Sequence, residues 1–386
     1  MVPNVARARL EASTAGEGAV RTGLPSWWGV APPSHRELIA AGVTAVAIRV
    51  VFACALMLGT HTSLHGWAML RDGESYLRVA AAVRGAMDVP NAFDWRVFPG
   101  YPLAIGAVGS IGIPLSLSAL LLTWGGAGVA AAAGGALFNR RDVAWALAVL
   151  LPGYLMYTSI AMSEGLLLGM TTVGLLMATR GRVAIGGLLL GYAGLIRPVA
   201  CFAVIAFGLW SLHRREIRNA LVCGVTALVV VATGWLTWRG WSHGAAQSVA
   251  LYNQAYGNRL LEWPFEALIA TPLQSPVAAW KVAYIYAHVL LVLVACAFAV
   301  RRLLLELPRP HTQGSMGVLA GAWLLGNTMF AVCVGQYWGF HEFHRFIVPA
   351  LPALYVVLEP LMPRERVWWV AASIASLAMA AFGIAC

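Results

Sequence analysis

Two carboxylates separated by a single residue, Asp72 and Glu74, follow the first long apolar segment of the chain. The sequence holds only four aspartates, and three of them lie within residues 61–114. A carboxylate in such a loop can take a proton from an acceptor hydroxyl as a general base, orient a sugar, or bind Mg²⁺ or Mn²⁺. Two carboxylates make a poor dedicated metal site, so the need for a divalent cation stays open. The alternative for Asp72 is a helix cap in a solvated loop.

Two further charged residues, Glu164 and Arg197, lie at the boundaries of apolar runs. Glu164 either faces a cavity, where it would orient a sugar or an acceptor, or begins a helix that Ser163 caps. Arg197 precedes Pro198, and a guanidinium at that depth is expected to pair, to reach the surface or to bind an anion. The planar guanidinium can donate two parallel hydrogen bonds to phosphate oxygens, so Arg197 is a candidate for binding a phosphorylated substrate.

The segment "QYWGFHEFHR" (336–345) places His341, His344 and Arg345 before a late apolar run. Its spacing is H-E-x-H, which does not put both histidines on one helix face as H-E-x-x-H does, so metalloprotease chemistry is disfavoured. Phosphate binding by Arg345, with the two histidines as hydrogen-bond donors, is the functional interpretation. A solvated rim charge is the alternative for Arg345.

These side chains need a scaffold, and the composition indicates that it lies in a membrane. The chain is 60% hydrophobic and 11% charged, with a mean hydropathy of +0.74. A helix needs about 20 mostly apolar residues to cross a bilayer, so the apolar runs predict an all-α polytopic membrane protein with about eleven transmembrane helices, within a range of about nine to twelve. The predicted spans are 38–60, 115–137, 143–158, 164–179, 183–196, 199–213, 217–238, 277–300, 316–335, 346–361 and 367–385.

The arginines set the predicted orientation. The net charge is +10, yet the arginines lie in short clusters between apolar runs, so we expect no nucleic-acid partner. If the N-terminus is cytoplasmic, all the arginine clusters are predicted to lie on the inside face of the membrane. This holds only if residues 98–114 do not cross the membrane fully but form a juxtamembrane helix or a re-entrant segment on the outer face. The clusters are Arg140–Arg141, Arg180 with Arg182, Arg214–Arg215 with Arg218, Arg301–Arg302, and Arg364 with Arg366.

Residues 1–36 are predicted to form a flexible cytoplasmic tail, and residues 37–386 a single transmembrane domain. Its outer loops are 61–114, 239–276 and 336–345, and loops carry function more often than the scaffold that positions them. The sequence contains no Walker A, G-x-S-x-G or dinucleotide fingerprint. The substrate is therefore expected to be borne by a membrane lipid and presented at the outer face of the cell membrane.

Five blocks, in order along residues 71–355, resemble the PIG-V-like mannosyltransferases of the GT-C superfamily of membrane glycosyltransferases. "RDGESYLRVAAAVRG" is similar to the family's aromatic-Asp-Gly-x-x-Tyr/Phe-x-x-Ile-Ala pattern, and "FPGYPL" to its Phe-Phe-Pro-x-Tyr-Pro-Leu stretch. "YTSIAMSEGLLL", "AGLIRPVACF" and "RFIVPALPALY" resemble its Tyr-Ser-Glu-Ser, Thr-Arg-Pro and Arg-x-x-x-Pro-x-x-Pro segments. The chain departs from these patterns at Arg71, Val97 and Gly165, where the family has Trp, Phe and Ser.

The resemblance implies a GT-C-like fold and transfer of a sugar, mannose in this family, from a polyprenyl-phosphate carrier to an acceptor hydroxyl on the outer face, with inversion. It implies that Asp72 is the general base, and Arg197 and Arg345 are candidates for holding the carrier phosphate. Tyr76 and Tyr101, which match the first two patterns, are expected to bind substrate. The acceptor stays open among a glycolipid, a lipoglycan and a protein.

Two other classes of protein compete with this interpretation. A lipid or sugar transporter, or a flippase of the cell envelope, would show inverted repeats or helices broken at the membrane midplane, and the sequence has no convincing internal repeat. A non-catalytic membrane scaffold explains the apolar runs but not the set formed by Asp72, Arg197 and Arg345.

Overall fold

The computed structural model describes residues 32–85, 94–241, 261–274, 277–308, 316–362 and 365–385. The regular secondary structure of these residues is helical, which confirms the predicted all-α membrane fold. In chain order the helices are α2 (His35–Thr60), α3 (Leu64–Ala68), α4 (Gly73–Val83), η1 (Asp94–Arg96), α5 (Gly100–Gly109), α6 (Leu115–Phe138), α7 (Arg141–Val149), α8 (Pro152–Ser159), α9 (Glu164–Thr179), α10 (Val183–Ile196), η2 (Pro198–Ala200), α11 (Cys201–His213), α12 (Ile217–Trp241), α14 (Glu266–Gln274), α15 (Ala279–Glu306), α16 (Met316–Cys333), α17 (Gln336–His341), α18 (Phe343–Ile347), η3 (Val348–Ala350), α19 (Leu351–Val357), η4 (Glu359–Leu361) and α20 (Arg366–Ala385).

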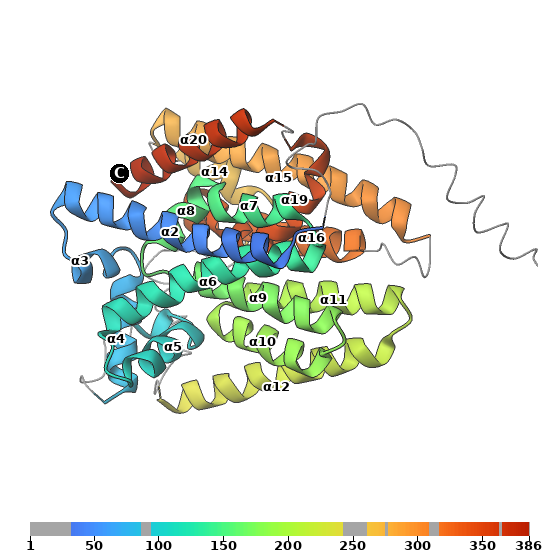
Figure 1. The fold of residues 1–386 in the computed structure, drawn as a ribbon, viewed down its shortest axis with the longest axis horizontal. Helices are drawn as coiled ribbons and strands as arrows, with labels where there is room; N and C mark the ends of the chain where they lie inside the picture. The colour runs from blue at the N-terminus through green and yellow to red at the C-terminus, as the bar shows by residue number, and fades with distance from the viewer. Residues whose placement is uncertain are drawn as a thin grey trace, which may run out of the picture.

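The first long helix, α2, begins and ends where local sequence signals place it. The Ser34 hydroxyl accepts a hydrogen bond from the Glu37 backbone N–H, and the Glu37 carboxylate accepts one from the Ser34 N–H, which is a reciprocal capping box. The helix runs for 26 residues and ends where His61 adopts a left-handed conformation with φ of 53°. It begins just inside the predicted tail, of which residues 1–31 lie outside the described part of the chain. Figure 1 shows α2 lying along α6 through the centre of the bundle.

Five helices are long and apolar enough to cross a membrane: α2, α6, α12, α15 and α16. Each coincides with a predicted span. The pair α8 and α9 would give a sixth crossing, bent by 108° at the break between them. The predicted spans 183–196, 199–213 and 367–385 appear as α10, as η2 with α11, and as α20, whose apolar parts are shorter.

Two predicted spans, 143–158 and 346–361, are wrong as single helices. The first divides into α7 and α8, because Leu150 is extended and Leu151 has a positive φ of 73° directly before Pro152. A residue that precedes proline is disfavoured in the helical region, which explains the position of the break. The second divides into α18, η3, α19 and η4, and each of the last three has a proline in its first turn, where the missing N–H is tolerated.

Arg49 stabilises the break between α7 and α8 from within α2. Its side chain is fully buried. Its Nε donates to Thr158 Oγ1 at 2.7 Å, one terminal nitrogen donates to the carbonyl of Ala148 at 3.0 Å, and the guanidinium carbon lies 4.8 Å from the centre of the Tyr154 ring. The carbonyls of the last helical turn have no intrahelical partner, so this arginine supplies the donor that α7 lacks and links α2 to both short helices.

The described residues of the predicted first outer loop form short helices that lie at one end of the bundle. Within residues 61–114 the structure has α3, α4, η1 and α5. Helix α5 has 10 residues, and at about 1.5 Å per residue it is too short to cross the membrane, as predicted for 98–114. Helix α4 packs on α5 and α6, so the residues at its start are held against the long helices.

The opposite end of the bundle holds arginines of the predicted clusters 140–141 and 301–302. Arg140 pairs with Glu359, to which Arg302 also donates at 2.9 Å. Arg141 pairs with Glu37 at 2.6 Å. These contacts join the starts of α2 and α7, the end of α15 and η4. Because α2 starts at this end and finishes beside α3, the bundle has an arginine-rich end and an end that carries helices α3 to α5.

Glycines allow α6 and α9 to approach closely. A methyl group at Gly126 would lie 2.5 Å from the carbonyl carbon of Gly165, and one at Gly165 would lie 2.1 Å from the carbonyl oxygen of Thr123. Small residues at a helix interface permit such close packing in membranes. Gly165 is the second residue of α9, so this contact also fixes the position of Glu164.

We predict that Gly126→Ala destabilises the protein, whereas Gly125→Ala does not. A methyl at Gly126 must push α9 away, which costs about 1–3 kcal/mol by overpacking. A methyl at the adjacent Gly125 meets nothing within 4 Å, and removing a helical glycine contributes about 0.5–1 kcal/mol of stability. Thermal unfolding of the two variants in detergent measures the difference. Equal unfolding temperatures would contradict the close contact of α6 with α9.

Candidate active site

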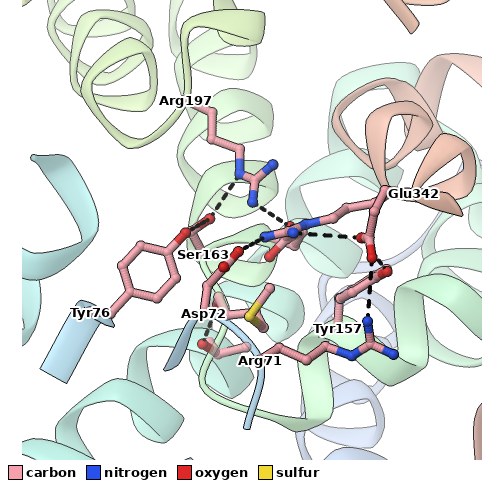
Figure 2. Close-up of polar contacts among 11 residues, drawn as sticks. Arg71, Asp72, Tyr76, Tyr157, Ser163, Arg197 and Glu342 are labelled. Atoms are coloured by element: carbon pink, nitrogen blue, oxygen red, sulfur yellow. Dashed lines mark hydrogen bonds and ion pairs between the residues drawn. The ribbon is translucent and has the colours of Figure 1, made fainter. Parts of the chain in front are cut away.

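Asp72 lies at the start of α4, directly after a tight turn. Arg71 has a positive φ of 57°, and a methyl at Gly73 would lie 2.0 Å from the carbonyl oxygen of Ala68, so only glycine fits there. The Asp72 side chain makes no capping hydrogen bond to α4, so the helix-cap alternative is wrong. Its Oδ2 accepts a hydrogen bond from Arg345 at 3.0 Å instead (Figure 2).

Arg345, in α18, contacts three carboxylates that come from three parts of the chain. Its Nε donates to Glu164 at the start of α9, one terminal nitrogen donates to Asp72, and the other lies 3.5 Å from Glu342. The guanidinium carbon lies 5.1 Å from the centre of the Tyr157 ring. The side chain is 7% exposed, so the alternative of a solvated rim charge is wrong.

The charges of this site are balanced. Burial alone lowers the pKa of Arg345, but Glu164, Asp72 and Glu342 together raise it well above its ordinary value. Two further arginines contact the same carboxylates, so three cations face three anions. Removing one member of such a buried set leaves an uncompensated charge. We call the six residues the charge cluster: Arg71, Asp72, Glu164, Arg197, Glu342 and Arg345.

Arg197 follows α10 and contacts Glu164 from the other side. One of its terminal nitrogens lies 2.9 Å from Glu164 Oε1, and its Nε donates to Ser163 Oγ at 3.0 Å. The Tyr76 hydroxyl donates to the same serine oxygen at 3.3 Å. Ser163 makes no capping bond to α9, so it acts as a link between Arg197 and Tyr76 (Figure 2). Burial raises the pKa of Tyr76, which keeps its hydroxyl protonated as a donor.

Two predicted site residues, Tyr101 and Glu74, lie apart from the charge cluster. The fully buried Tyr101 hydroxyl lies 2.6 Å from Thr123 Oγ1 and donates to a backbone carbonyl of α6 at 2.8 Å, so it joins α5 to α6. Glu74 pairs with Arg78 and its side chain is 42% exposed. In the part of the chain that the structure describes, no three His, Cys, Asp or Glu side chains are grouped so that they could hold a metal ion.

Glu342 is a member of the charge cluster that the sequence patterns did not single out. Its Oε2 accepts a hydrogen bond from the Tyr157 hydroxyl at 2.5 Å, and its Oε1 lies 3.3 Å from Arg71. Glu342 stands three residues before Arg345, a spacing at which opposite charges meet on a helical surface. The spacing of three residues between Glu342 and Arg345 is the sequence signal that could have identified Glu342 as a partner of Arg345.

A cavity of about 760 Å³ begins at Arg71, the residue next to Asp72, and extends between α8, α15 and α20. Its polar wall is formed by Arg71, Lys281, His341, Glu342 and His344. Lys281 is the single lysine of the chain. The rest of the wall is mostly apolar and includes Trp280, Ile285, Met379 and Phe382. The cavity is therefore amphipathic, with a cationic end beside Asp72 and an apolar end between membrane helices.

Both predicted histidines line this cavity rather than contact Asp72. The buried His344 ring stacks on Tyr157 with 5.5 Å between ring centres, and its Nδ1 has no hydrogen-bond partner among the described residues. Burial, His288 and nearby cations lower the pKa of His344 well below its ordinary value, so the ring is neutral. Burial and Lys281 lower the pKa of His341.

Comparison with known proteins supports the fold. No protein-family model and no curated protein matches the chain. Six chains of solved structures match it, among them ArnT from Cupriavidus metallidurans, which was crystallised with undecaprenyl phosphate bound. That match has a TM-score of 0.51 and 15% sequence identity, and it covers 86% of this chain and 62% of ArnT. The chain thus spans less than two thirds of the length of ArnT, and it has the GT-C fold that the sequence resemblance implied.

We predict that Arg345→Met lowers the free energy of unfolding by about 3–5 kcal/mol, the cost of breaking a buried ion pair by removing one partner. The methionine keeps most of the side-chain volume but leaves Asp72, Glu164 and Glu342 with one cation fewer. Thermal and denaturant unfolding in detergent measure the loss. Arg180→Met is the control, because this arginine is exposed at the other end of the bundle and its replacement should change stability by less than about 0.5 kcal/mol. A similar loss in both variants would show that the charge cluster is not a buried unit.

Proposed function

We propose that this protein is an integral-membrane glycosyltransferase that moves a sugar from a polyprenyl-phosphate carrier to an acceptor hydroxyl. The environment of Asp72 carries the proposal. Arg345 orients the Asp72 carboxylate, and 28% of the Asp72 side chain stays exposed. Arg71, the residue before Asp72, lines an amphipathic cavity. The fold gives further support, because it is similar to that of a protein crystallised with undecaprenyl phosphate.

Asp72 acts in this proposal as the general base. As the acceptor oxygen forms its bond to the anomeric carbon, the Asp72 carboxylate takes the hydroxyl proton. The bond from that carbon to the phosphate oxygen breaks on the opposite face of the sugar, so the configuration inverts and the electron pair leaves with the phosphate. A base must be ionised to do this, and the contact with Arg345 favours the ionised carboxylate.

The carrier phosphate is assigned to the cationic end of the cavity. Arg71 is 39% exposed on its side chain although it lies 3.3 Å from Glu342, and Lys281 lines the same wall. Two cations can bind the carrier phosphate through charge-assisted hydrogen bonds and hold it while the sugar is transferred. His341 and His344 lie on that wall as well and can donate hydrogen bonds, the latter through its unpartnered Nδ1.

This assignment changes the roles expected for Arg197 and Arg345. Each already binds Glu164, and neither lines the cavity. We therefore propose that they hold Glu164 and Asp72 in place, and that Arg71 and Lys281 bind the phosphate. Arg345 positions Asp72 by direct contact, and Arg197 positions Glu164, which also contacts Arg345.

The apolar end of the cavity fits the first isoprene units of the carrier. Trp280 from α15 contacts Phe382 from α20, with 4.8 Å between ring centres, and Met379 adds a flexible apolar surface. Both helices are apolar, so a tail that leaves the cavity between them enters the hydrocarbon of the bilayer.

Mannose is the first donor sugar to test, because of the resemblance of the segments around Asp72 and Tyr101 to the PIG-V-like family. The acceptor is a hydroxyl of a glycolipid, a lipoglycan or a protein. The gathering of arginines at one end of the bundle supports a cytoplasmic N-terminus and an active site on the outer face of the cell membrane.

Neither Mg²⁺ nor Mn²⁺ has a step in this mechanism. A cation at Asp72 and Glu74 would compete with Arg345 and Arg78, which already bind these carboxylates. We therefore propose that arginine and lysine supply the positive charge of the site.

We predict that Asp72→Asn lowers the rate of transfer by about 100-fold or more, the lower bound of what a positioned base contributes. The assay uses purified protein with polyprenyl-phosphate-mannose, and the arabinose, glucose and galactose donors are run in parallel, each with and without EDTA. Glu216→Gln, which alters a carboxylate at the arginine-rich end, is the control and should keep normal activity. Unfolding temperature checks that both variants are folded.

Three outcomes would contradict the proposal. Full activity of Asp72→Asn would remove Asp72 as the base. Movement of carrier lipid across a vesicle membrane without transfer of sugar would favour the flippase. Complete loss of activity in EDTA, restored by Mg²⁺ or Mn²⁺, would show that a cation takes the role that we assign to the arginines and Lys281.

We further predict that Lys281→Met raises the KM for the carrier about tenfold with little change in kcat, since it removes one charge-assisted contact to the phosphate in both the ground state and the transition state. Methionine preserves the apolar stem of the lysine, so the cavity keeps its shape. Arg197→Met is the comparison: by the roles above it should lower kcat or stability rather than weaken carrier binding. A raised KM in Arg197→Met together with an unchanged KM in Lys281→Met would indicate that Arg197 binds the carrier phosphate.

A further inference from the structure

A second cavity, of about 430 Å³, lies at the arginine-rich end of the bundle. It is bounded by the loop between α9 and α10, the first turn of α10 and the first two turns of α12. Arg197 at the far end of α10 belongs to the charge cluster, so the length of this 14-residue helix, about 21 Å, separates the two sites. The cavity is thus independent of the proposed transferase site.

The cavity has two cationic side chains without a counter-ion. Arg182 and Arg218 both line it, and neither side chain makes an ion pair or a hydrogen bond to another described residue. The nearest carboxylate in sequence, Glu216, is already bound by Arg214 at 3.0 Å and by the amide of Asn219 at 2.9 Å. Arg140 and Arg141 of this end are paired with carboxylates. Arg180 and Arg215 are exposed but do not line the cavity, so the cavity is where two arginines from different helices, unpaired among the described residues, face a common space.

The walls beside these arginines are apolar. Val183, Ile185 and Val222 line the cavity, and Ile185 is 48% exposed. The exposed apolar surface continues along both helices, away from the arginines, through Leu188 on α10 and Leu221 and Val225 on α12. Both helices belong to the apolar bundle, so this surface faces hydrocarbon. A ligand that fills the cavity therefore contacts two cations at one end. The rest of the ligand can extend along the hydrocarbon-facing surfaces of α10 and α12.

We propose that this cavity binds the phosphate headgroup of an anionic phospholipid. Arg182 and Arg218 bind the phosphate from two helices, and the acyl chains lie along α10 and α12. Basic pockets between membrane helices bind anionic headgroups in this manner, and a guanidinium fork matches two phosphate oxygens. The bound lipid bridges the α9–α10 loop and α12.

The proposal is tested on the full-length protein in detergent, with phosphatidylglycerol as the probe and native mass spectrometry or equilibrium binding as the measurement. The variant Arg182→Gln/Arg218→Gln should raise the Kd for phosphatidylglycerol about tenfold or more, since each arginine near an anionic lipid contributes about 1 kcal/mol, or about fivefold. Phosphatidylcholine, which has no net charge, should bind at least about tenfold more weakly to the unaltered protein.

The matched control is Arg180→Gln/Arg215→Gln, which removes the same charge from exposed arginines at the same end that do not line the cavity. It should change the Kd by less than about threefold, because only diffuse attraction is lost. Equal losses in the two double variants, no loss in the cavity variant, or equally tight binding of phosphatidylcholine would each overturn the proposal. Inorganic phosphate that binds as tightly as the lipid would also overturn it, because the apolar walls would then contribute nothing.

Discussion

The buried guanidinium of Arg345 holds the functional end of this protein together. It joins α18 to the start of α9 through Glu164 and to the start of α4 through Asp72, and it also contacts Glu342 just before α18. Such a set is stable only when every charge is paired, because an isolated ion in a water-poor interior is costly. The balance of three arginines and three carboxylates satisfies that condition. The contact with Arg345 also orients the Asp72 carboxylate, as the proposed role of Asp72 as a general base requires.

Broken helices bring these charges to the same place. The pair α8 and α9 bends by 108°, so Tyr157 and Glu164 from either side of the break reach one site. Each break exposes backbone groups that need partners, and buried side chains supply them, as Arg49 does at the end of α7. Close helix packing at Gly126 then fixes where α9 starts. The geometry of the charge cluster thus depends on irregular backbone that is buried inside the protein, away from lipid.

The two ends of the bundle use arginine in different ways. At the end with Asp72, Arg71, Arg197 and Arg345 are each paired with a carboxylate, and Arg345 is buried. At the opposite end several are exposed, and Arg182 and Arg218 have no carboxylate partner among the described residues. An exposed guanidinium keeps its attraction for a phosphate, whereas a paired one has most of its charge offset by its neighbour. This argument supports a phospholipid headgroup at Arg182 and Arg218. The proposed carrier site at the other end depends instead on Lys281 together with Arg71, which is paired with Glu342 but 39% exposed.

The sequence by itself determined that the chain is a helical membrane protein and that Asp72, Glu164, Arg197 and Arg345 are unusual, because apolar run length and the cost of isolated charges are local properties. Only the tertiary structure decided their partners, since the contact between Asp72 and Arg345 joins residues 273 positions apart. It also divided two predicted spans where proline and backbone conformation outweigh apolar length. Tyr101 matched a sequence pattern and Glu74 follows Asp72 by two residues, yet neither side chain contacts the charge cluster. Sequence fixes the type of a residue, whereas packing fixes the direction of its side chain.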